Sequence, residues 1–293
     1  VAASLRQQQT RSFGVLMRFF HGSYFADVLQ GFNDVAYPDY DCLVAVHSDD
    51  AEKERKHLQV LMEKRVDGLF AEFSGAEENL DLYREIASKS SLPVVLLNCG
   101  VDTLGIPIVR ADHFSATYKP TNALLELGHQ RIHYVSLQVK EQMSSLRKRG
   151  YLAAMREAGL ESQAAITEKP LIKGWNAERL AQTGREIIEQ WLGSEDKATA
   201  MLISDDYLAH EVLSQLEADY NMNVPGDLSL MGIGNRSASR LPRIGLSSVS
   251  VDHEELGRRA GNLLLKMIEG NNPEDTEIVL PVTVHLRKTT AAL

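Results

Sequence analysis

The sequence has few of the features that would reveal a chemistry on their own. Its 293 residues include two cysteines, Cys42 and Cys99, which fall in or beside apolar, strand-like runs. We expect two reduced, buried thiols rather than a disulfide, because disulfides are rare in reducing compartments. No apolar run approaches the roughly 20 residues that cross a membrane. No secretory leader precedes the first strand-like segment, so a cytoplasmic protein is expected.

The sequence motifs of the common enzyme classes are absent as well. There is no Gly-x-Ser-x-Gly elbow, His-Glu-x-x-His zinc motif, Walker A loop or Cys-x-x-Cys pair. The nine histidines are scattered along the chain. We find no nucleophile with a nearby base, and we expect neither a metal nor a cofactor. The chain is therefore predicted not to be an enzyme, and a sugar-processing enzyme is the weakest of three hypotheses.

Positive charge is also scarce, with 31 lysines and arginines against 40 acidic residues and a net charge of -9. Binding to nucleic acid needs a clustered basic surface. This chain is thus a poor DNA binder by itself. A hydrophobic content of 44% and a charged content of 24% suit a globular protein with a sizeable core.

What the sequence does contain is a repeated alternation of strand-like and helical segments. In the first third we expect strands at 12–17, 41–47, 66–73 and 92–98, with helices at 24–35, 50–64 and 78–89. Such alternation predicts parallel sheets that are covered by helices on both faces.

The alternation restarts after a helix at 122–127. Strands are expected at 131–137, 166–171, 198–203 and 228–233, with helices at 146–158, 177–191, 206–220 and 254–269 and an edge strand within 276–287. Because late segments must return to the first half, we predict an α/β fold with two Rossmann-like subdomains whose parallel sheets face a cleft.

Several short motifs occur in a characteristic order. They are RVDGL at 65–69, GH at 128–129, AMLISDD at 200–206, VPGDLS at 224–229, LSSV at 246–249 and LGRRA at 256–260. No one of them is specific, but their order and spacing together resemble the lactose-repressor/galactose-repressor (LacI/GalR) family of bacterial transcription regulators. The resemblance covers nearly the whole chain.

The resemblance implies a periplasmic-binding-protein-like core of type I, with two subdomains joined by three crossovers. We expect an N-terminal subdomain at 12–127 plus 251–280 and a C-terminal subdomain at 128–250 plus 281–293. Such a core binds a small effector, here expected to be a sugar or related polar metabolite, and forms a side-by-side homodimer. The family binds operator DNA through a helix-turn-helix domain, which is absent from this sequence.

Residues 1–11 resemble the end of the family's hinge helix. Leu5 stands where the family has a leucine that wedges into the minor groove, and an apolar wedge between base steps bends DNA.

In the C-terminal half, the resemblance points to four effector contacts. Arg147 matches an effector-contacting arginine whose planar fork can bind a carboxylate or two hydroxyls. Trp175 falls where the family has an aromatic ring that stacks on the ligand, although a loop tryptophan that packs on its own subdomain is nearly as plausible. Asp205 is assigned to the ligand, while Asp206 is expected mainly to cap the following helix. Asn235 could still bind, although Gly234 and Asn235 replace the family's two aspartates, which weakens any transfer of a hexose specificity.

In the N-terminal half, the loop after the first strand is expected to line the cleft. His21 and Ser23 are candidate hydrogen-bonding residues, and Tyr24 and Phe25 are candidate walls. Phe25 could equally belong to the core at the start of a helix. Asp112 is a further candidate, for which capping or a crossover role is at least as plausible.

A second function on the same fold is a solute-binding protein of a sugar transporter or chemoreceptor. The absence of a leader and the hinge-like residues 1–11 favour the regulator.

Overall fold

The computed structural model describes residues 9–20, 22–89, 92–98, 105–138, 141–170, 176–271 and 276–293. The chain divides into two compact units. Unit 1 comprises residues 1–111 and 252–280, and unit 2 comprises residues 112–251 and 281–293. The chain therefore passes between the units three times. Residues 112–127, which sequence analysis placed with the first subdomain, fall in unit 2 in this division.

Unit 1 contains a parallel sheet, in which six strands lie within the described residues. In spatial order they are β11 (Glu277–Leu280), β5 (Ile108–Ala111), β4 (Val94–Leu97), β3 (Gly68–Glu72), β1 (Ser12–Met17) and β2 (Asp41–Val46). The central strands β1, β3 and β4 are buried along their whole length, whereas the edge strand β2 is partly exposed. This difference follows from position, because only inner strands are covered on all sides.

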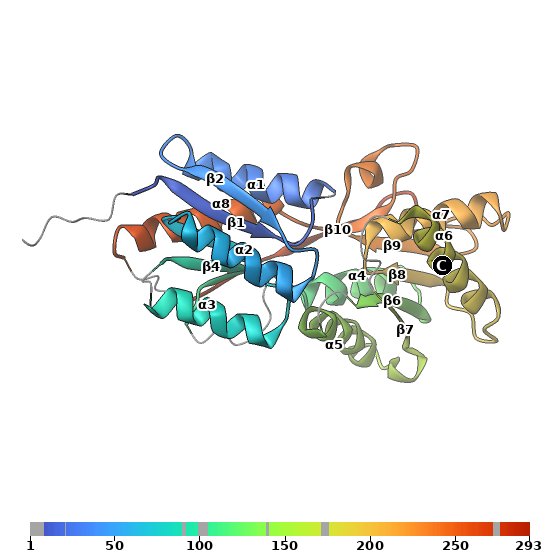
Figure 1. The fold of residues 1–293 in the computed structure, drawn as a ribbon. Helices are drawn as coiled ribbons and strands as arrows, with labels where there is room; N and C mark the ends of the chain where they lie inside the picture. Colours follow the sequence, from blue (N-terminus) through green and yellow to red (C-terminus); the bar gives the residue numbers. More distant parts are fainter. Residues whose placement is uncertain are drawn as a thin grey trace, which may run out of the picture. The chain divides into compact units, whose positions relative to one another are not determined.

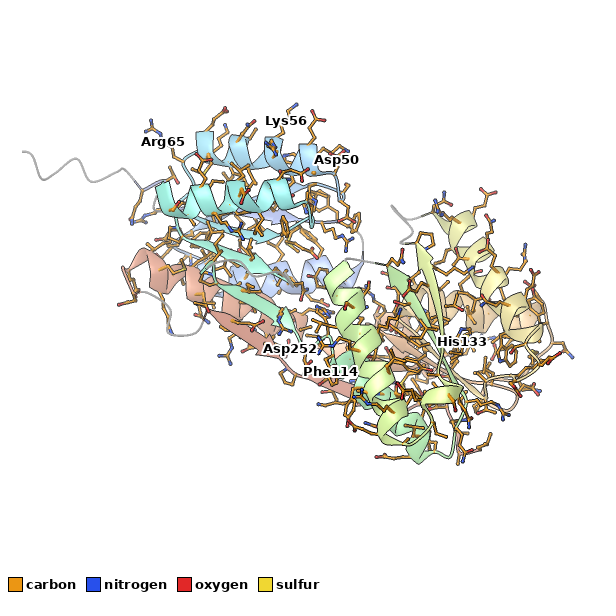
Figure 2. All side chains as sticks on the ribbon, turned by 90° about the horizontal axis from the view of Figure 1, so that it is seen from below. Asp50, Lys56, Arg65, Phe114, His133 and Asp252 are labelled. Carbon is orange, nitrogen blue, oxygen red and sulfur yellow. The ribbon has the colours of Figure 1, made fainter. Side chains whose placement is uncertain are left out.

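Helices cover both faces of this sheet, as Figure 1 and Figure 2 show. On one face lie α2 (Ala51–Glu63) and α3 (Glu77–Lys89), which bury Leu58, Leu61 and Tyr83 against the strands. On the other lie α1 (Ser23–Ala36) and α8 (His253–Ile268). The carboxylates of Asp50 and Asp252, both labelled in Figure 2, accept hydrogen bonds from the first amides of α2 and α8.

Glycines allow α1 and α8 to approach closely. A Cβ on Gly31 would overlap the carbonyl of Glu254, and a Cβ on Gly257 would overlap the carbonyl of Val28. Phe32 of α1 then stacks on Phe70 of β3, with ring centroids 4.9 Å apart. The glycine of the LGRRA motif thus has a packing role in this helix pair.

Unit 2 contains a second sheet, again with six strands within the described residues. In spatial order they are β12 (Val282–His285), β10 (Ser247–Val251), β9 (Ser229–Ile233), β8 (Ala200–Ile203), β6 (Ile132–Gln138) and β7 (Ala165–Pro170). All neighbouring pairs are parallel except β12 with β10, which is antiparallel.

Helix pairs cover the two faces of this sheet too (Figure 1). α4 (Ser115–Glu126) and α5 (Glu141–Glu157) bury Leu124, Tyr151 and Met155 on one face. α6 (Ala177–Leu192) and α7 (Asp206–Ala218) bury side chains such as Trp191 on the other. A Cβ on Gly150 of α5 would overlap the carbonyl of Phe114, so a glycine again sets the approach of two helices.

The predicted fold class, two α/β subdomains with mostly parallel sheets, is confirmed. Three predicted elements differ. The helix expected at 122–127 begins at Ser115, and the one expected at 146–158 begins at Glu141, so Arg147 lies within α5 rather than at its start. The single tail strand is two strands, β11 and β12, one in each sheet. Strands β5 and β10 were not predicted; β5 contains Arg110, and three of the five residues of β10 are serine.

The described part of the chain has no helix that is both long and apolar enough to cross a membrane. Cys42 is a free thiol that is only partly buried in the edge strand β2, and burial raises its pKa to about 11. It is thus less enclosed than the sequence suggested, while Cys99 lies outside the described residues.

Candidate functional site

The order of the strands singles out one place in unit 2. After β6 the chain forms β7 on one side and then β8 on the other, so the connections diverge between β6 and β8. In open parallel sheets, ligands bind beyond the carboxyl ends of the strands at such a switch point. Arg147 lies on the helix that follows β6, and Asp205 follows β8 directly. Two of the predicted contacts therefore converge on this edge.

Arg147 is partly buried, and not all of its guanidinium donors have an acceptor among the described residues. Its Nη1 donates to the backbone carbonyl of Ser204, at 3.2 Å. Its Nε is buried and has no partner among the described residues. Burial lowers the pKa of this guanidinium, while the neighbouring Tyr134 and Asp205 oppose the shift. The arginine is thus a positioned cation at the switch point.

Asp205 caps helix α7. Its Oδ1 accepts hydrogen bonds from the amides of Tyr207, at 2.8 Å, and Leu208, at 3.3 Å. Its Oδ2 lies 3.9 Å from Nη2 of Arg236. Burial raises the pKa of this carboxyl, and the Arg236 guanidinium opposes that shift.

Asp206, predicted to be the cap, is instead a fully buried acceptor. Its Oδ1 accepts from Ser248 at 2.6 Å, and its Oδ2 accepts from Ser239 at 2.6 Å and from the amide of Arg236 at 2.8 Å. The capping prediction for Asp206 is therefore wrong. The cap residue has extended backbone (φ -150°), and Asp206 already has helical geometry that turns its side chain inward.

The loop after β9 completes this cluster. Gly234 and Asn235 have positive φ angles of 131° and 45°, a region that favours glycine and tolerates asparagine. The Asn235 side-chain oxygen accepts from Nη2 of Arg287, at 2.6 Å, so it is already engaged. Arg236 follows, with its guanidinium 4.9 Å from the ring centroid of Tyr207. We call Arg147, Asp205, Asp206 and Arg236 the edge cluster.

Unit 1 has a corresponding switch point between β1 and β3. Tyr24, near the start of α1, accepts a hydrogen bond from Nδ2 of Asn98, at 2.8 Å, and its ring meets the edge of His253. Phe25 is partly buried and packs edge-on against Phe20, a ring that is 60% exposed. Ser23 is the first residue of α1. Tyr24 therefore lies at the carboxyl edge, whereas Phe25 belongs to a small aromatic pair at the helix start.

Charged residues that sequence analysis missed lie at the same edge of unit 1. Arg18, directly after β1, forms a buried ion pair with Asp49. The backbone carbonyl of Glu72 lies 2.8 Å from Nε2 of His47, and its carboxylate accepts from the amide of Arg18. Each of these residues ends or follows a strand. The rule that ligand sites form at the carboxyl ends of parallel strands could have found them.

Asp112 lies at the start of α4, where its Oδ1 accepts a hydrogen bond from the amide of Ser115, at 3.0 Å. This contact fits the capping alternative that the sequence left open. Leu5, His21 and Trp175 lie outside the described residues. The described residues hold no group of three or more potential metal ligands.

Comparison with known proteins places the chain in a family. The profile of the periplasmic binding protein-like domain matches residues 121–290, more than half of the sequence. The chain belongs to this family. The HTH-type transcriptional repressor PurR of Pasteurella multocida is 28% identical over 98% of this chain and 84% of its own length. Catabolite control protein A of Priestia megaterium is 28% identical over 99% of this chain and 85% of its own length.

Solved structures agree with this assignment. The transcription regulator CcpA of Lactococcus lactis has a TM-score of 0.80 and 27% identity, covering 96% of this chain and 100% of its own. A LacI-family regulator from Enterococcus faecium has a TM-score of 0.81 at 24% identity, covering 96% and 99%. The chain is thus the periplasmic-binding-protein-like effector-binding core of a LacI-family regulator, as the resemblance implied. These relatives are transcription regulators rather than enzymes.

In this LacI-family core, Arg147 and Asp205 lie together at one sheet edge, and Asn235 lies in the neighbouring loop. Arg236 is the prominent residue that sequence analysis missed. Its signal was weak, because a single arginine in a polar loop is usually a solvated side chain.

Proposed function

We propose that the edge cluster of unit 2 binds the effector of this regulator, and that the effector is a sugar or a related polar metabolite. The observation that carries this proposal is the position of Arg147 and Asp205 at the switch point of a parallel sheet, with buried donor capacity left over on Arg147. Asn235, Trp175, His21, Ser23, Tyr24 and Phe25 are proposed as further contacts.

Proteins of the same fold support the choice of ligand class. The Enterococcus faecium regulator is described with bound ribose, and the regulator CelR is described as a complex with cellobiose. Sugars are recognised by carboxylates, amides and arginine forks that bind pairs of hydroxyls, together with flat apolar rings. The proposed contacts contain each of these groups.

We further propose that this core forms a homodimer and controls operator DNA in the cytoplasm through a helix-turn-helix domain. The net charge of -9 makes direct DNA binding by this chain unfavourable, and the PurR relatives are named as HTH-type repressors. Effector binding would alter DNA affinity if it favours one arrangement of the core over another. Light scattering of the purified chain tests the dimer.

A thermal-shift screen tests the effector site. The panel comprises sugars, sugar phosphates, sugar acids, nucleobases and nucleosides, because a ligand that binds only the folded state raises the melting temperature. We expect Arg147→Ala to weaken binding of the hit by roughly tenfold or more, the effect of losing one charged hydrogen bond. Trp175→Ala should weaken it as well.

The matched control is Arg149→Ala, an exposed arginine on the same helix. This variant removes an equal charge and should bind like the unmutated chain. If Arg147→Ala retains full affinity while its circular dichroism spectrum is unchanged, the edge cluster of unit 2 is not the effector site.

A further inference from the structure

Arg236 is a partly buried cation, and two of its guanidinium nitrogens have no acceptor among the described residues. Its side chain is 18% exposed, and its Nε and Nη1 atoms are buried with no hydrogen-bond partner among the described residues. Among the described residues, Oδ2 of Asp205 is the carboxylate oxygen that lies within 4.0 Å of its guanidinium, and its distance of 3.9 Å from Nη2 is beyond hydrogen-bond range. The ring of Tyr207 holds the guanidinium in place from one side.

The neighbouring carboxylate cannot supply the missing acceptors. Asp206 already accepts from Ser248, Ser239 and the backbone amide of Arg236, so its oxygens serve the fold. Asp205 uses Oδ1 for two helix amides. A buried charged donor that lacks an acceptor is costly. An acceptor that comes from outside the chain would relieve this cost.

A second arginine lies near Asp205. Arg147 also has a buried Nε with no partner among the described residues, and Asp205 acts electrostatically on it. Two guanidinium groups therefore depend on one nearby carboxylate whose Oδ1 is already bonded to backbone amides. Burial raises the pKa of that carboxyl, and the Arg236 guanidinium opposes the shift.

The loop that follows β9 does not supply the missing hydrogen-bond acceptors. Gly234 has no side chain, and the Asn235 oxygen is engaged by Arg287. A Cβ on Gly234 would lie 3.3 Å from Nε of Arg236, so a larger residue at this position would crowd the unpartnered donor. The two carboxylates that the LacI resemblance leads one to expect here are both missing.

We propose that the effector of this regulator carries an anionic group, a carboxylate or a phosphate, which Arg236 and Arg147 bind together. This inference rests on the proposed effector site and specifies its ligand class. Planar guanidinium groups match the oxygens of carboxylates and phosphates in paired hydrogen bonds, and Nε with one Nη is the edge that makes such pairs.

Isothermal titration calorimetry on the full chain tests the proposal with matched neutral and charged probes. D-Glucose is compared with D-gluconate and D-glucose 6-phosphate, D-galactose is compared with D-galacturonate, and inorganic phosphate is titrated alone. We expect a charged member to bind at least about tenfold more tightly than its neutral partner. Preference for the acids or for the phosphates separates the two sources of charge.

Arg236→Gln should weaken binding of the charged probe by about tenfold to a hundredfold and leave the melting temperature without ligand nearly unchanged. Arg236→Lys should recover part of the loss, because it keeps the charge but not the fork. Arg243→Gln, which removes an exposed arginine of the same unit, should have no effect.

The outcomes separate the inference from the proposed function. If a neutral sugar binds as tightly as its acid, and binding depends on Arg147 but not on Arg236, the effector site stands and the anionic class is overturned. If a charged probe binds Arg147→Ala and Arg236→Gln as tightly as it binds the unmutated chain, the effector site does not lie at the edge cluster. If no probe binds, including phosphate at millimolar concentration, both are overturned.

Discussion

Asp205 and Asp206 show how one residue of difference along a helix start changes the role of a carboxylate. Asp205 has extended backbone and caps the helix, whereas Asp206 has helical backbone and is buried under Ser239 and Ser248. Both roles use the same chemistry, a carboxylate that accepts hydrogen bonds. They differ in burial, and therefore in what is lost when the carboxylate is removed.

We expect Asp206→Ala to lower the free energy of unfolding by roughly 3 kcal/mol, because it leaves three donors without their acceptor. Asp205→Ala should cost about 1 kcal/mol, the usual effect of a lost helix cap. Urea denaturation followed by tryptophan fluorescence measures both, since Trp175 and Trp191 both belong to unit 2. Equal losses in the two variants would contradict the assigned roles.

At the scale of elements, glycines determine how closely helices pack. In unit 1 they lie where α1 meets α8, and in unit 2 Gly150 lies where α5 meets α4. A side chain at these positions would meet backbone atoms, which cannot move aside as a flexible side chain can. This explains in physical terms why a glycine stands at position 257, in the LGRRA motif, and at position 150 of α5.

Gly257→Ala is expected to destabilise unit 1 by about 2–3 kcal/mol through overpacking, although alanine is the better helix former. The control is Asn262→Ala, an exposed position on the same helix, which should be neutral or stabilising by about 0.5 kcal/mol. Thermal unfolding followed by far-UV circular dichroism distinguishes them. A Gly257→Ala protein as stable as the control would mean that the two helices separate without cost.

Element prediction from the sequence succeeded where the periodicity was strong. The strand at 12–17 was predicted with its observed limits, and the helix expected at 177–191 extends by a single residue. It failed for β5, which carries the charged Arg110, and for β10, in which three of five residues are serine, because neither has a strong apolar signal. It also failed for the start of α4, whose Pro120 is the sixth helical residue and removes one backbone hydrogen bond of the helix.

At the scale of the whole molecule, several histidines with shifted pKa values lie in one unit. Burial lowers the pKa of His129, His133, His210 and His285, all of which belong to unit 2. His133 is nearly enclosed, with its Nε2 only 2.8 Å from the hydroxyl of Thr167. The folded state therefore favours the neutral form of each ring.

Unit 2 should lose stability as the pH falls below about 6.5, the ordinary histidine value. In this range the histidines bind protons more readily in the unfolded chain than in the folded chain, so protonation favours unfolding. The urea midpoint of the tryptophan transition should be lower at pH 5.5 than at pH 7.5. His133→Gln should reduce the difference. The raised pKa of Asp205 acts in the opposite direction, so a midpoint that rises on acidification would show that carboxylates dominate.

The sequence by itself determined the fold class and the family, and it predicted an approximate place for the site. Hydrophobic periodicity and motif order are local signals, and a carboxyl end of a strand can be recognised along the chain. Only the tertiary structure decided which aspartate caps α7, which glycines separate the helices, and that Arg236 has buried donors with no partner among the described residues. Those facts depend on contacts between segments that are distant in the sequence, and a local sequence pattern does not specify such contacts.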